Sequence, residues 1–274
     1  MENRANNMTL DFSVIIPVHN EAEILRYTLR SIYNLEPREI IFILDRCTDN
    51  TEKIIKSFWK KTNLGNKVKL MLLKVNKKSH WRLHLNFLYD FGIRSAVSAI
   101  VLLSQADILH DYVTIKNKIN LASHGLVSFA VLEHPHISPW NHFVTKTLRR
   151  ASKFFDIQRF SGLIALNKKY YLACPLTSND FLNFDTQIQE NFRRKGYRYK
   201  YVPSNNFNLR PSLVSRGGYF KLWKVGEDRY LMKKPFLKVL ALSLARLTPE
   251  VLVGYLHAKY SMVNQKMEME KNLR

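Results

Sequence analysis

The first fifty residues alternate between apolar runs and an amphipathic stretch, a pattern that few folds accommodate. Residues 13–16 and 40–44 are short apolar runs rich in β-branched side chains. Such runs are typical of parallel strands buried on both faces. Residues 21–35 carry apolar side chains at helical spacing, and Asn20 with Glu23 is suited to cap that helix. We therefore predict a strand, a crossover helix and a second strand of a parallel sheet.

Polar side chains follow both predicted strands at their carboxyl ends. Pro17 closes the first apolar run and is followed by His19 and Glu21. The second run ends at Asp45, and Asp49 follows it. Ligands of parallel α/β sheets bind beyond the carboxyl ends of the strands. These residues are therefore candidates for a binding site.

The same two segments resemble motifs of a known family. Residues 17–21, Pro-Val-His-Asn-Glu, are similar to the Pro-x-Tyr-Asn-Glu opening of the family 2 glycosyltransferases of GT-A fold. Residues 45–49, Asp-Arg-Cys-Thr-Asp, are similar to their Asp-Asp-Gly-Ser-Thr-Asp segment from its second Asp onward. The resemblance implies that Asp45 hydrogen-bonds the base or ribose of a nucleotide. The other residues implied to line this donor site are Pro17, His19 and Glu21.

Two departures from the family pattern leave the identity of the base open. His19 replaces the usual Tyr, and Arg46 with Cys47 replaces the more flexible Gly-Ser. The expected donor is a UDP- or GDP-linked sugar. The alternative for Asp45 is a solvated carboxylate at the end of a strand.

A metal-binding motif is implied after the apolar run at residues 100–103. Gln105-Ala-Asp107 resembles the family's Asp-x-Asp motif, with Gln105 in place of the first Asp. The resemblance implies that Asp107 and the donor phosphates hold Mg²⁺ or Mn²⁺, which stabilises the charge of the leaving group. Because Gln105 is neutral, metal affinity without nucleotide should be low. Alternatively, Asp107 simply ends a strand.

A catalytic residue is implied in residues 184–203, which resemble the family's Glu-Asp-x-x-Leu helix followed by Gly-Tyr and a strand closed by Pro. Asp185 takes the place of that Asp, and Phe184 replaces the Glu. The positive end of the helix keeps Asp185 ionised, as a general base requires. Asp185 would take the proton from an acceptor hydroxyl, with inversion at the anomeric carbon, or position a lipid phosphate acceptor. The alternatives are a helix cap without a chemical role, and Asp180 as the base.

Basic segments supply candidates for phosphate contacts. One segment follows a third predicted strand at residues 68–75, one is a predicted basic helix at residues 145–155, and one covers residues 208–221. Each of them can also be a solvated surface. The candidate residues are Lys77, Arg82, Arg149, Arg210 and Arg216.

The charge and the termini bear on partners and location. The formal net charge of +21 favours an anionic partner, which could be a nucleotide diphosphate, a nucleic acid or an anionic membrane. A nucleic acid is not expected, because no helix-turn-helix, zinc-finger or RNA-binding aromatic signature is present. Two cysteines make no disulfide framework, and the polar N-terminal residues lack the apolar region of a signal peptide. We expect a cytoplasmic protein that can be peripheral on the inner face of the cell membrane.

The C-terminal region is apolar but interrupted by charges. Between residues 234 and 260 no uninterrupted stretch reaches the ~20 residues that a spanning helix needs. We predict one helix over residues 237–247 and a second with Thr248 as cap and Pro249 at its first position. These helices either pack on the catalytic domain or in a homodimer interface, or rest on an anionic membrane surface.

These observations predict an α/β protein of GT-A fold, with a mostly parallel sheet flanked by helices. The catalytic domain is expected over residues 9–209, and a basic helical extension over residues 210–274. The expected function is metal-assisted, inverting transfer of a sugar from a nucleotide-diphosphate sugar to a glycan hydroxyl or a polyprenyl phosphate. An inactive nucleotide-sugar-binding protein is an alternative, because Gln105 and Phe184 each remove an acidic residue. A nucleotidyltransferase is a further alternative, although it would be expected to carry a Gly-rich phosphate loop.

Overall fold

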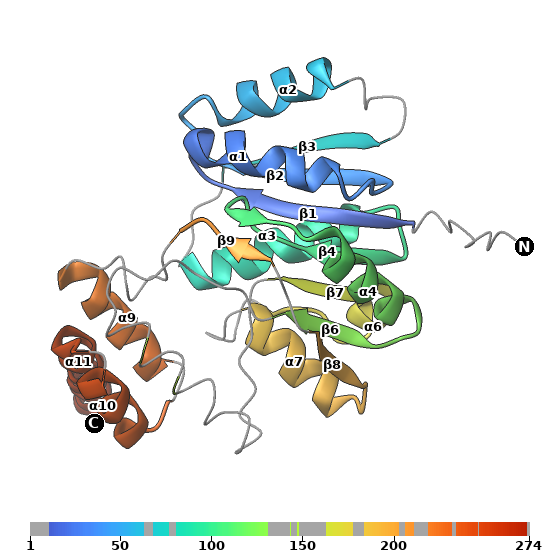
Figure 1. Ribbon diagram of the computed structural model, residues 1–274. Coiled ribbons are helices and arrows are strands. Elements are labelled where there is room, and N and C mark those ends of the chain that lie inside the picture. Colours follow the sequence, from blue (N-terminus) through green and yellow to red (C-terminus); the bar gives the residue numbers. More distant parts are fainter. Residues whose placement is uncertain are drawn as a thin grey trace, which may run out of the picture. The chain divides into compact units, whose positions relative to one another are not determined.

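In the computed structural model, the chain forms two compact units (Figure 1). The first unit comprises residues 1–133 and 159–209, and the second comprises residues 134–158 and 210–274. The residues described by the structure are 11–62, 68–76, 81–130, 143, 147, 163–177, 184–202, 206–210, 219–231, 234–245 and 247–272.

The first unit alternates strands and helices along the chain. Its strands are β1 (Phe12–Val18), β2 (Glu39–Asp45), β3 (Lys69–Val75), β4 (Ile100–Leu103), β5 (Ile108–Leu109), β6 (Val127–Ala130), β7 (Ile164–Asn167), β8 (Tyr199–Val202) and β9 (Phe207–Asn208). Its helices are α1 (Ala22–Tyr33), α2 (Thr51–Lys61), α3 (Trp81–Ser95), α4 (Tyr112–Ser123), α6 (Lys168–Leu172) and α7 (Phe184–Arg194).

Within the described residues, seven strands form one sheet in the order β3-β2-β1-β4-β7-β6-β8. The pairs β3–β2, β2–β1, β1–β4 and β6–β8 are parallel, whereas β7 runs antiparallel to both of its neighbours. Strands β5 and β9 pair separately in an antiparallel ladder. The predicted mostly parallel sheet is confirmed, and its parallel strands β1 to β4 end at a common edge.

Helices cover both faces of this sheet, and each face has its own core. One core contains Leu29 of α1, Ile55 of α2 and Ile119 of α4. The other contains Tyr89 of α3 and Ile188 of α7. Because successive residues of a strand point to opposite faces, a strand between two such layers must be apolar throughout. This explains the continuous apolar runs in the sequence.

Pro17 lies inside β1, which continues to Val18, so it does not close the strand as the sequence suggested. Peptide groups two residues apart face the same side of a strand. Ile15 accepts a hydrogen bond from the Ser104 amide on the β4 side, at 2.9 Å. Strand β4 has already ended at Leu103, so the missing N–H of Pro17 removes no ladder bond.

The second unit contains helices α9 (Tyr219–Leu231), α10 (Phe236–Ala245) and α11 (Pro249–Asn272). The two helices predicted near the C-terminus are confirmed, with Pro249 at the first position of the second. Among the helices described, none is long and apolar enough to cross a membrane.

Two glycines allow close packing of α9 and α11. A Cβ atom on Gly226 would overlap the Val251 carbonyl oxygen, and one on Gly254 would overlap the Trp223 carbonyl oxygen. Both obstacles are backbone atoms, which no rotamer change can move. The absence of side chains at this crossing therefore sets how closely the two helices approach.

Candidate active site

The sheet register places His19 beside Asp45. Val18 pairs with Leu44 across β1 and β2, so the next residue of each strand lies at the common carboxyl edge. His19 donates from Nδ1 to the Asp45 carbonyl oxygen at 2.6 Å. The sequence prediction that these residues meet at one edge is therefore confirmed by the geometry.

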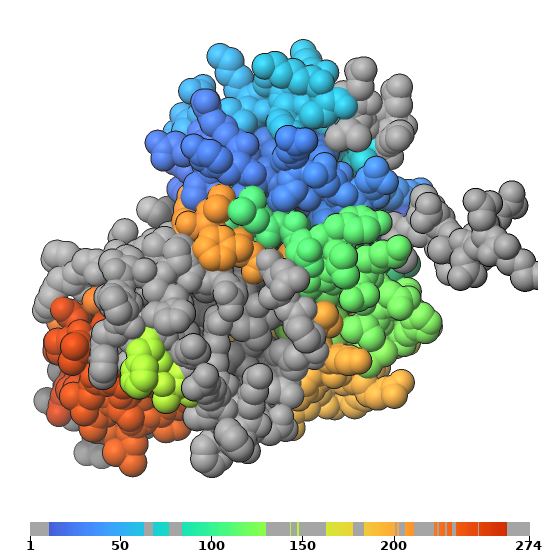
Figure 2. Space-filling view, in the orientation of Figure 1, coloured from blue at the N-terminus to red at the C-terminus, as the bar shows by residue number. Residues whose placement is uncertain are grey.

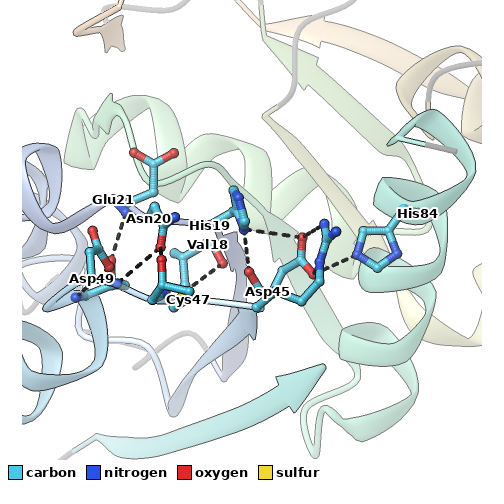
Figure 3. Close-up of polar contacts among 11 residues, drawn as sticks. Val18, His19, Asn20, Glu21, Asp45, Cys47, Asp49 and His84 are labelled. Carbon is cyan, nitrogen blue, oxygen red and sulfur yellow. Dashed lines mark hydrogen bonds and ion pairs between the residues drawn. The ribbon is translucent and has the colours of Figure 1, made fainter. Parts of the chain in front are cut away.

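Asp45 is the centre of a compact polar cluster (Figure 3). Its side chain is only 7% exposed. Arg46 donates from Nε to Oδ1 and from Nη2 to Oδ2, both at 2.8 Å. His84 of α3 donates from Nε2 to Oδ1 at 2.7 Å. The carboxylate thus has a bidentate guanidinium partner and an imidazole partner.

These partners keep Asp45 ionised. Burial acts to raise the pKa of Asp45, but hydrogen bonds from Arg46 and His84, together with their positive charge, lower it by more. The pKa therefore lies below its ordinary value. His84 was not singled out from the sequence, because no motif marks it and only the folded chain brings α3 to the end of β2.

Asn20 joins the two loops that follow β1 and β2. Its Oδ1 accepts hydrogen bonds from the amides of Thr48 at 2.8 Å and Asp49 at 3.3 Å. The expectation that Asn20 caps α1 was wrong, because Glu21 is the N-cap of that helix. The physical reason is that the neighbouring loop offers Asn20 two backbone donors.

Asp49 completes this connection in the opposite direction. Its Oδ2 accepts from the Ala22 amide and its Oδ1 from the Thr51 amide, both at 3.0 Å. Glu21 donates from its backbone amide to Thr51 Oγ1 at 2.8 Å, and its side chain is only partly buried. The polar motifs of residues 17–21 and 45–49 therefore build one rigid edge (Figure 3).

The segment after β4 carries Gln105, which is half-buried, and Asp107, which is buried. Backbone atoms fix this segment: the Asp107 carbonyl accepts from the Leu209 amide at 2.8 Å, and the Ala106 carbonyl accepts from Thr28 Oγ1 at 2.6 Å. Asp107 is thus held in place on two sides, from α1 and from the residues after β9.

Asp185 lies in the first turn of α7, as predicted. Its Oδ1 accepts from the Thr186 amide at 2.7 Å. Phe184, which replaces an acidic residue of the family motif, is buried and packs against Tyr89 with ring centroids 4.2 Å apart. Phe184 therefore serves the core between α3 and α7.

The Tyr89 hydroxyl lies within electrostatic range of both Asp107 and Asp185. It donates to the Ser104 carbonyl at 2.8 Å and is fully buried. Burial raises the pKa of Tyr89 well above its ordinary value, and the negative charges of Asp107 and Asp185 raise it further. Both carboxylates thus act on one phenol at the end of β4. No motif in the sequence marks Tyr89, which stands out only as one of the residues of a predicted helix.

The side chains near Asp107 limit how a metal ion could bind. Among the described residues, no group of three or more His, Cys, Asp or Glu side chains is placed to hold one. Mg²⁺ and Mn²⁺ accept oxygen ligands, and Mg²⁺ is often bound by one or two carboxylates plus substrate phosphates. Asp107 fits that arrangement, with Gln105 as a neutral neighbour.

The predicted phosphate contacts are only partly described. Lys77, Arg149 and Arg216 lie outside the described residues, as does the substitute base Asp180. Arg82 belongs to α3, but its side chain is not described. Arg210 is described and half-buried, two residues after β9 ends. The roles of these cations stay predictions.

The family of the chain follows from a comparison with family models. The model for glycosyl transferase family 2 matches residues 13–174. The chain therefore belongs to glycosyl transferase family 2, as the motifs at residues 17–21 and 45–49 predicted. The predicted enzyme class, a glycosyltransferase, is confirmed with it. The comparison with curated proteins gives no significant match.

Solved structures confirm the GT-A fold. A mannosyltransferase from Pyrobaculum calidifontis, in complex with GDP-Man and Mn²⁺, is 17% identical and has a TM-score of 0.59, over 96% of this chain and 79% of that one. A mycobacterial protein is 14% identical with a TM-score of 0.54, over 83% and 76%. S. aureus TarS 1–349 in complex with UDP-GlcNAc is 13% identical with a TM-score of 0.50, over 81% and 70%.

Proposed function

We propose that this protein transfers a sugar from a nucleotide-diphosphate sugar to an acceptor, with inversion at the anomeric carbon. The observation that carries the proposal is the placement of Asp107 and Asp185 around the end of β4. Asp107 follows that strand, and Asp185 lies in the first turn of α7, next to Phe184, which packs on Tyr89; the Tyr89 hydroxyl in turn donates to the Ser104 carbonyl after β4. A transferase of this kind needs one carboxylate for the diphosphate side and another for the acceptor. We assign this chemistry to residues 9–209.

The donor is proposed to lie along the carboxyl edge of the sheet. The base or ribose lies near His19 and Asp45, and the diphosphate near Asp107, with Gln105 toward the sugar. Complexes of similar structures with GDP-Man and UDP-GlcNAc support a donor of this class. A divalent ion at Asp107 would neutralise charge on the leaving diphosphate.

In the proposed step, the Asp185 carboxylate takes the proton from an acceptor hydroxyl. The freed oxygen forms a bond to the anomeric carbon while the bond from that carbon to the diphosphate oxygen breaks, and the nucleoside diphosphate leaves with the electron pair. A polyprenyl phosphate acceptor is already an anion, so Asp185 would then position it. The N-terminus of α7 favours the ionised carboxylate in either case.

The second unit is proposed to bind an anionic membrane surface through α10. Leu237 and Leu244 are 75% and 65% exposed and lie two helical turns apart on one face. Val239 and Ser243 of the same helix are buried. Residues 210–274 hold thirteen Lys or Arg against five Asp or Glu. Exposed apolar side chains on a basic helical unit suit an anionic interface. Figure 2 shows the red end of the chain at the surface of this unit.

The membrane proposal is tested by vesicle flotation. Vesicles containing phosphatidylglycerol should carry the protein, and vesicles of phosphatidylcholine alone should carry much less. The double variant Leu237→Asp with Leu244→Asp should lose binding, whereas Val113→Asp, at a comparably exposed site on α4, should retain it. Equal binding of the double variant and the wild type would contradict the proposal.

One second candidate is favoured by a specific observation. Gln105 and Phe184 each replace an acidic residue, which suits a protein that binds a nucleotide sugar without turning it over. The nucleotidyltransferase alternative has no further support, since the chain belongs to a glycosyltransferase family.

The test combines binding and turnover. Binding is measured as thermal shifts with UDP and GDP, each with and without Mn²⁺, and turnover as release of the nucleoside diphosphate from UDP-GlcNAc or GDP-Man with a glycan or a polyprenyl phosphate. Lipid extraction of the labelled product distinguishes the two acceptors. Asp185→Asn should keep the thermal shift but lower turnover roughly 10²- to 10⁴-fold.

The matched control is Glu190→Gln, which removes a partly exposed carboxylate from the same helix. It should retain wild-type turnover. Turnover by Asp185→Asn at the wild-type rate would contradict the assigned base. A wild-type protein that binds nucleotide but never releases it from a donor would favour the inactive candidate.

A further inference from the structure

The carboxylate that the family motif would offer to the base is already engaged by this chain's own side chains. Three N–H groups point at Asp45: Nε and Nη2 of Arg46, and Nε2 of His84. The Asp45 side chain is 7% exposed, whereas that of Arg46 is 32% exposed. A ligand that approaches this edge therefore meets the guanidinium before the carboxylate.

The backbone supports this placement of Arg46. Its φ of 47° lies in the left-handed region, which a non-glycine residue rarely occupies. Its amide donates to the Val75 carbonyl at 3.0 Å, so the turn is tied to the end of β3. The turn folds the side chain back along Asp45, and the bidentate contact fixes the plane of the guanidinium.

We propose that Arg46, held in place by Asp45 and His84, is the residue that recognises the base of the donor by donating to one of its carbonyl oxygens. This inference rests on the proposed function of the site. Of the five N–H groups of the guanidinium, two bond Asp45, and the other three have no hydrogen-bond partner among the described residues. Asp45 and His84 are then positioning residues.

The chemistry of the bases sets what this arrangement selects. Uracil, guanine and cytosine each carry a ring carbonyl oxygen, whereas adenine carries none. Adenine accepts hydrogen bonds only at ring nitrogens, so a guanidinium fixed in place to donate to a carbonyl oxygen favours the three carbonyl-bearing bases. ADP is therefore the matched control nucleotide, with the same ribose and diphosphate but without the group that Arg46 would contact.

A simpler role for Arg46 makes the opposite prediction. If Arg46 only covers Asp45 and must move away before the base binds the carboxylate, its removal frees Asp45 and strengthens nucleotide binding. If Arg46 itself contacts the base, its removal weakens binding and erases the preference between bases. The sign of the effect separates the two roles.

The experiment measures the affinity of UDP, GDP, CDP and ADP in the presence of Mn²⁺ by calorimetry, for wild type and variants of the full chain. Arg46→Ala should weaken the preferred nucleotide roughly 10- to 100-fold and leave ADP nearly unchanged. Arg46→Lys keeps the charge but loses the planar fork, so it should recover only part of the preference. Asp45→Asn should erase the preference as Arg46→Ala does, while Mn²⁺-dependent pyrophosphate binding is retained.

Arg38→Ala is the matched control variant. Arg38 also contacts an aspartate, Asp11, at 3.0 Å, but at the amino edge of the sheet and with both side chains more than half exposed. It should bind all four nucleotides as the wild type does.

The experiment distinguishes failure of the Arg46 assignment from failure of the proposed function. If the wild type prefers one nucleotide and Arg46→Ala keeps that preference or binds more tightly, the assignment of Arg46 is overturned and the proposed function stands. If the wild type binds none of the four nucleotides, the proposed function falls and the assignment falls with it. Should Arg46→Ala not fold, Arg46→Lys and Arg46→Gln give the same comparison.

Discussion

Strand β2 begins and ends with a buried carboxylate, and the two are held in different ways. Glu39, its first residue, is fully buried, and Oε1 accepts from Ser13 Oγ and from the Val97 amide, each at 2.6 Å. Its Oε2 has no hydrogen-bond partner within the described part of the chain. Asp45, its last residue, accepts from a guanidinium and an imidazole.

The two sets of donors indicate which buried carboxylate is suited to function. The donors to Glu39 are a neutral hydroxyl and a neutral backbone amide of the fold itself, so they cannot be exchanged without disrupting the fold. The guanidinium beside Asp45 reaches solvent and keeps further donors that a ligand could use. We therefore expect Glu39 to govern stability alone, and Asp45 to govern both stability and nucleotide affinity.

Glu39→Ala should lower the stability of the protein more than any other substitution considered. It leaves the buried Ser13 Oγ and the partly buried Val97 amide without an acceptor, at a cost of about 3 kcal/mol in the free energy of unfolding. Urea denaturation measures this loss. The nucleotide affinity of the folded protein should not change. Glu23→Ala, at an exposed position of α1, should cost less than about 0.5 kcal/mol. A loss below about 1 kcal/mol for Glu39→Ala would contradict the structural role assigned to Glu39.

The next effect is that of Asp45→Asn. It removes the charge that Arg46 and His84 contact, and we expect a loss of about 2 kcal/mol in the free energy of unfolding. Unlike Glu39→Gln, it should also weaken the binding of the preferred nucleotide in calorimetry. If both variants bind nucleotide equally well, the functional difference between the two ends of β2 is refuted.

A smaller effect on the free energy of unfolding is expected when the pH is lowered. Burial acts to raise the pKa of Asp45, but the hydrogen bonds from Arg46 and His84 set it below the ordinary value of 3.8. A carboxylate with a lowered folded-state pKa stabilises the protein fully above the unfolded-state pKa, and this contribution is lost as the pH falls through the folded-state pKa. The stability difference between wild type and Asp45→Asn should therefore be constant above about pH 5 and shrink below pH 3.8. A difference that grows on acidification would contradict the ion pair.

The smallest effect is expected for Glu190→Gln on α7. Glu190 also meets arginines, with Arg193 at 2.8 Å and Arg194 at 2.9 Å, and their hydrogen bonds lower its pKa to about 2. Both arginine side chains are mostly exposed, so solvent screens the interaction. The free energy of unfolding should change by less than about 0.5 kcal/mol in urea denaturation. A loss as large as that of Asp45→Asn would show that burial does not explain why the Asp45 ion pair stabilises the protein more than the ion pairs of Glu190.

Much of the parallel sheet could be predicted from the sequence, because strands covered by helices on both faces must be apolar throughout. The runs that became β1, β2 and β4 carry this signal, whereas the edge strand β3 contains Lys69 and Lys74. The antiparallel direction of β7 was not predicted. Its apolar run has the same composition as a parallel strand, and direction depends on the path of the chain between elements.

The site could be predicted where a motif is continuous in the chain, and not where it depends on a distant helix. His84 and Asp45 are 39 positions apart, and helical periodicity indicates only which face of α3 is buried. Tyr89 was missed for the same reason. Asn20 was misread as a cap, because the sequence does not show that the amides of Thr48 and Asp49 lie within its reach.

The left-handed backbone at Arg46 has a consequence for how this site could evolve. Glycine adopts a φ of 47° freely, so Arg46→Gly would relieve the turn and expose Asp45 in a single step. The backbone strain of this turn and, under our proposal, the choice of base therefore depend on the same residue. A homologue with glycine at this position would have a less strained turn and, under our proposal, a different donor preference.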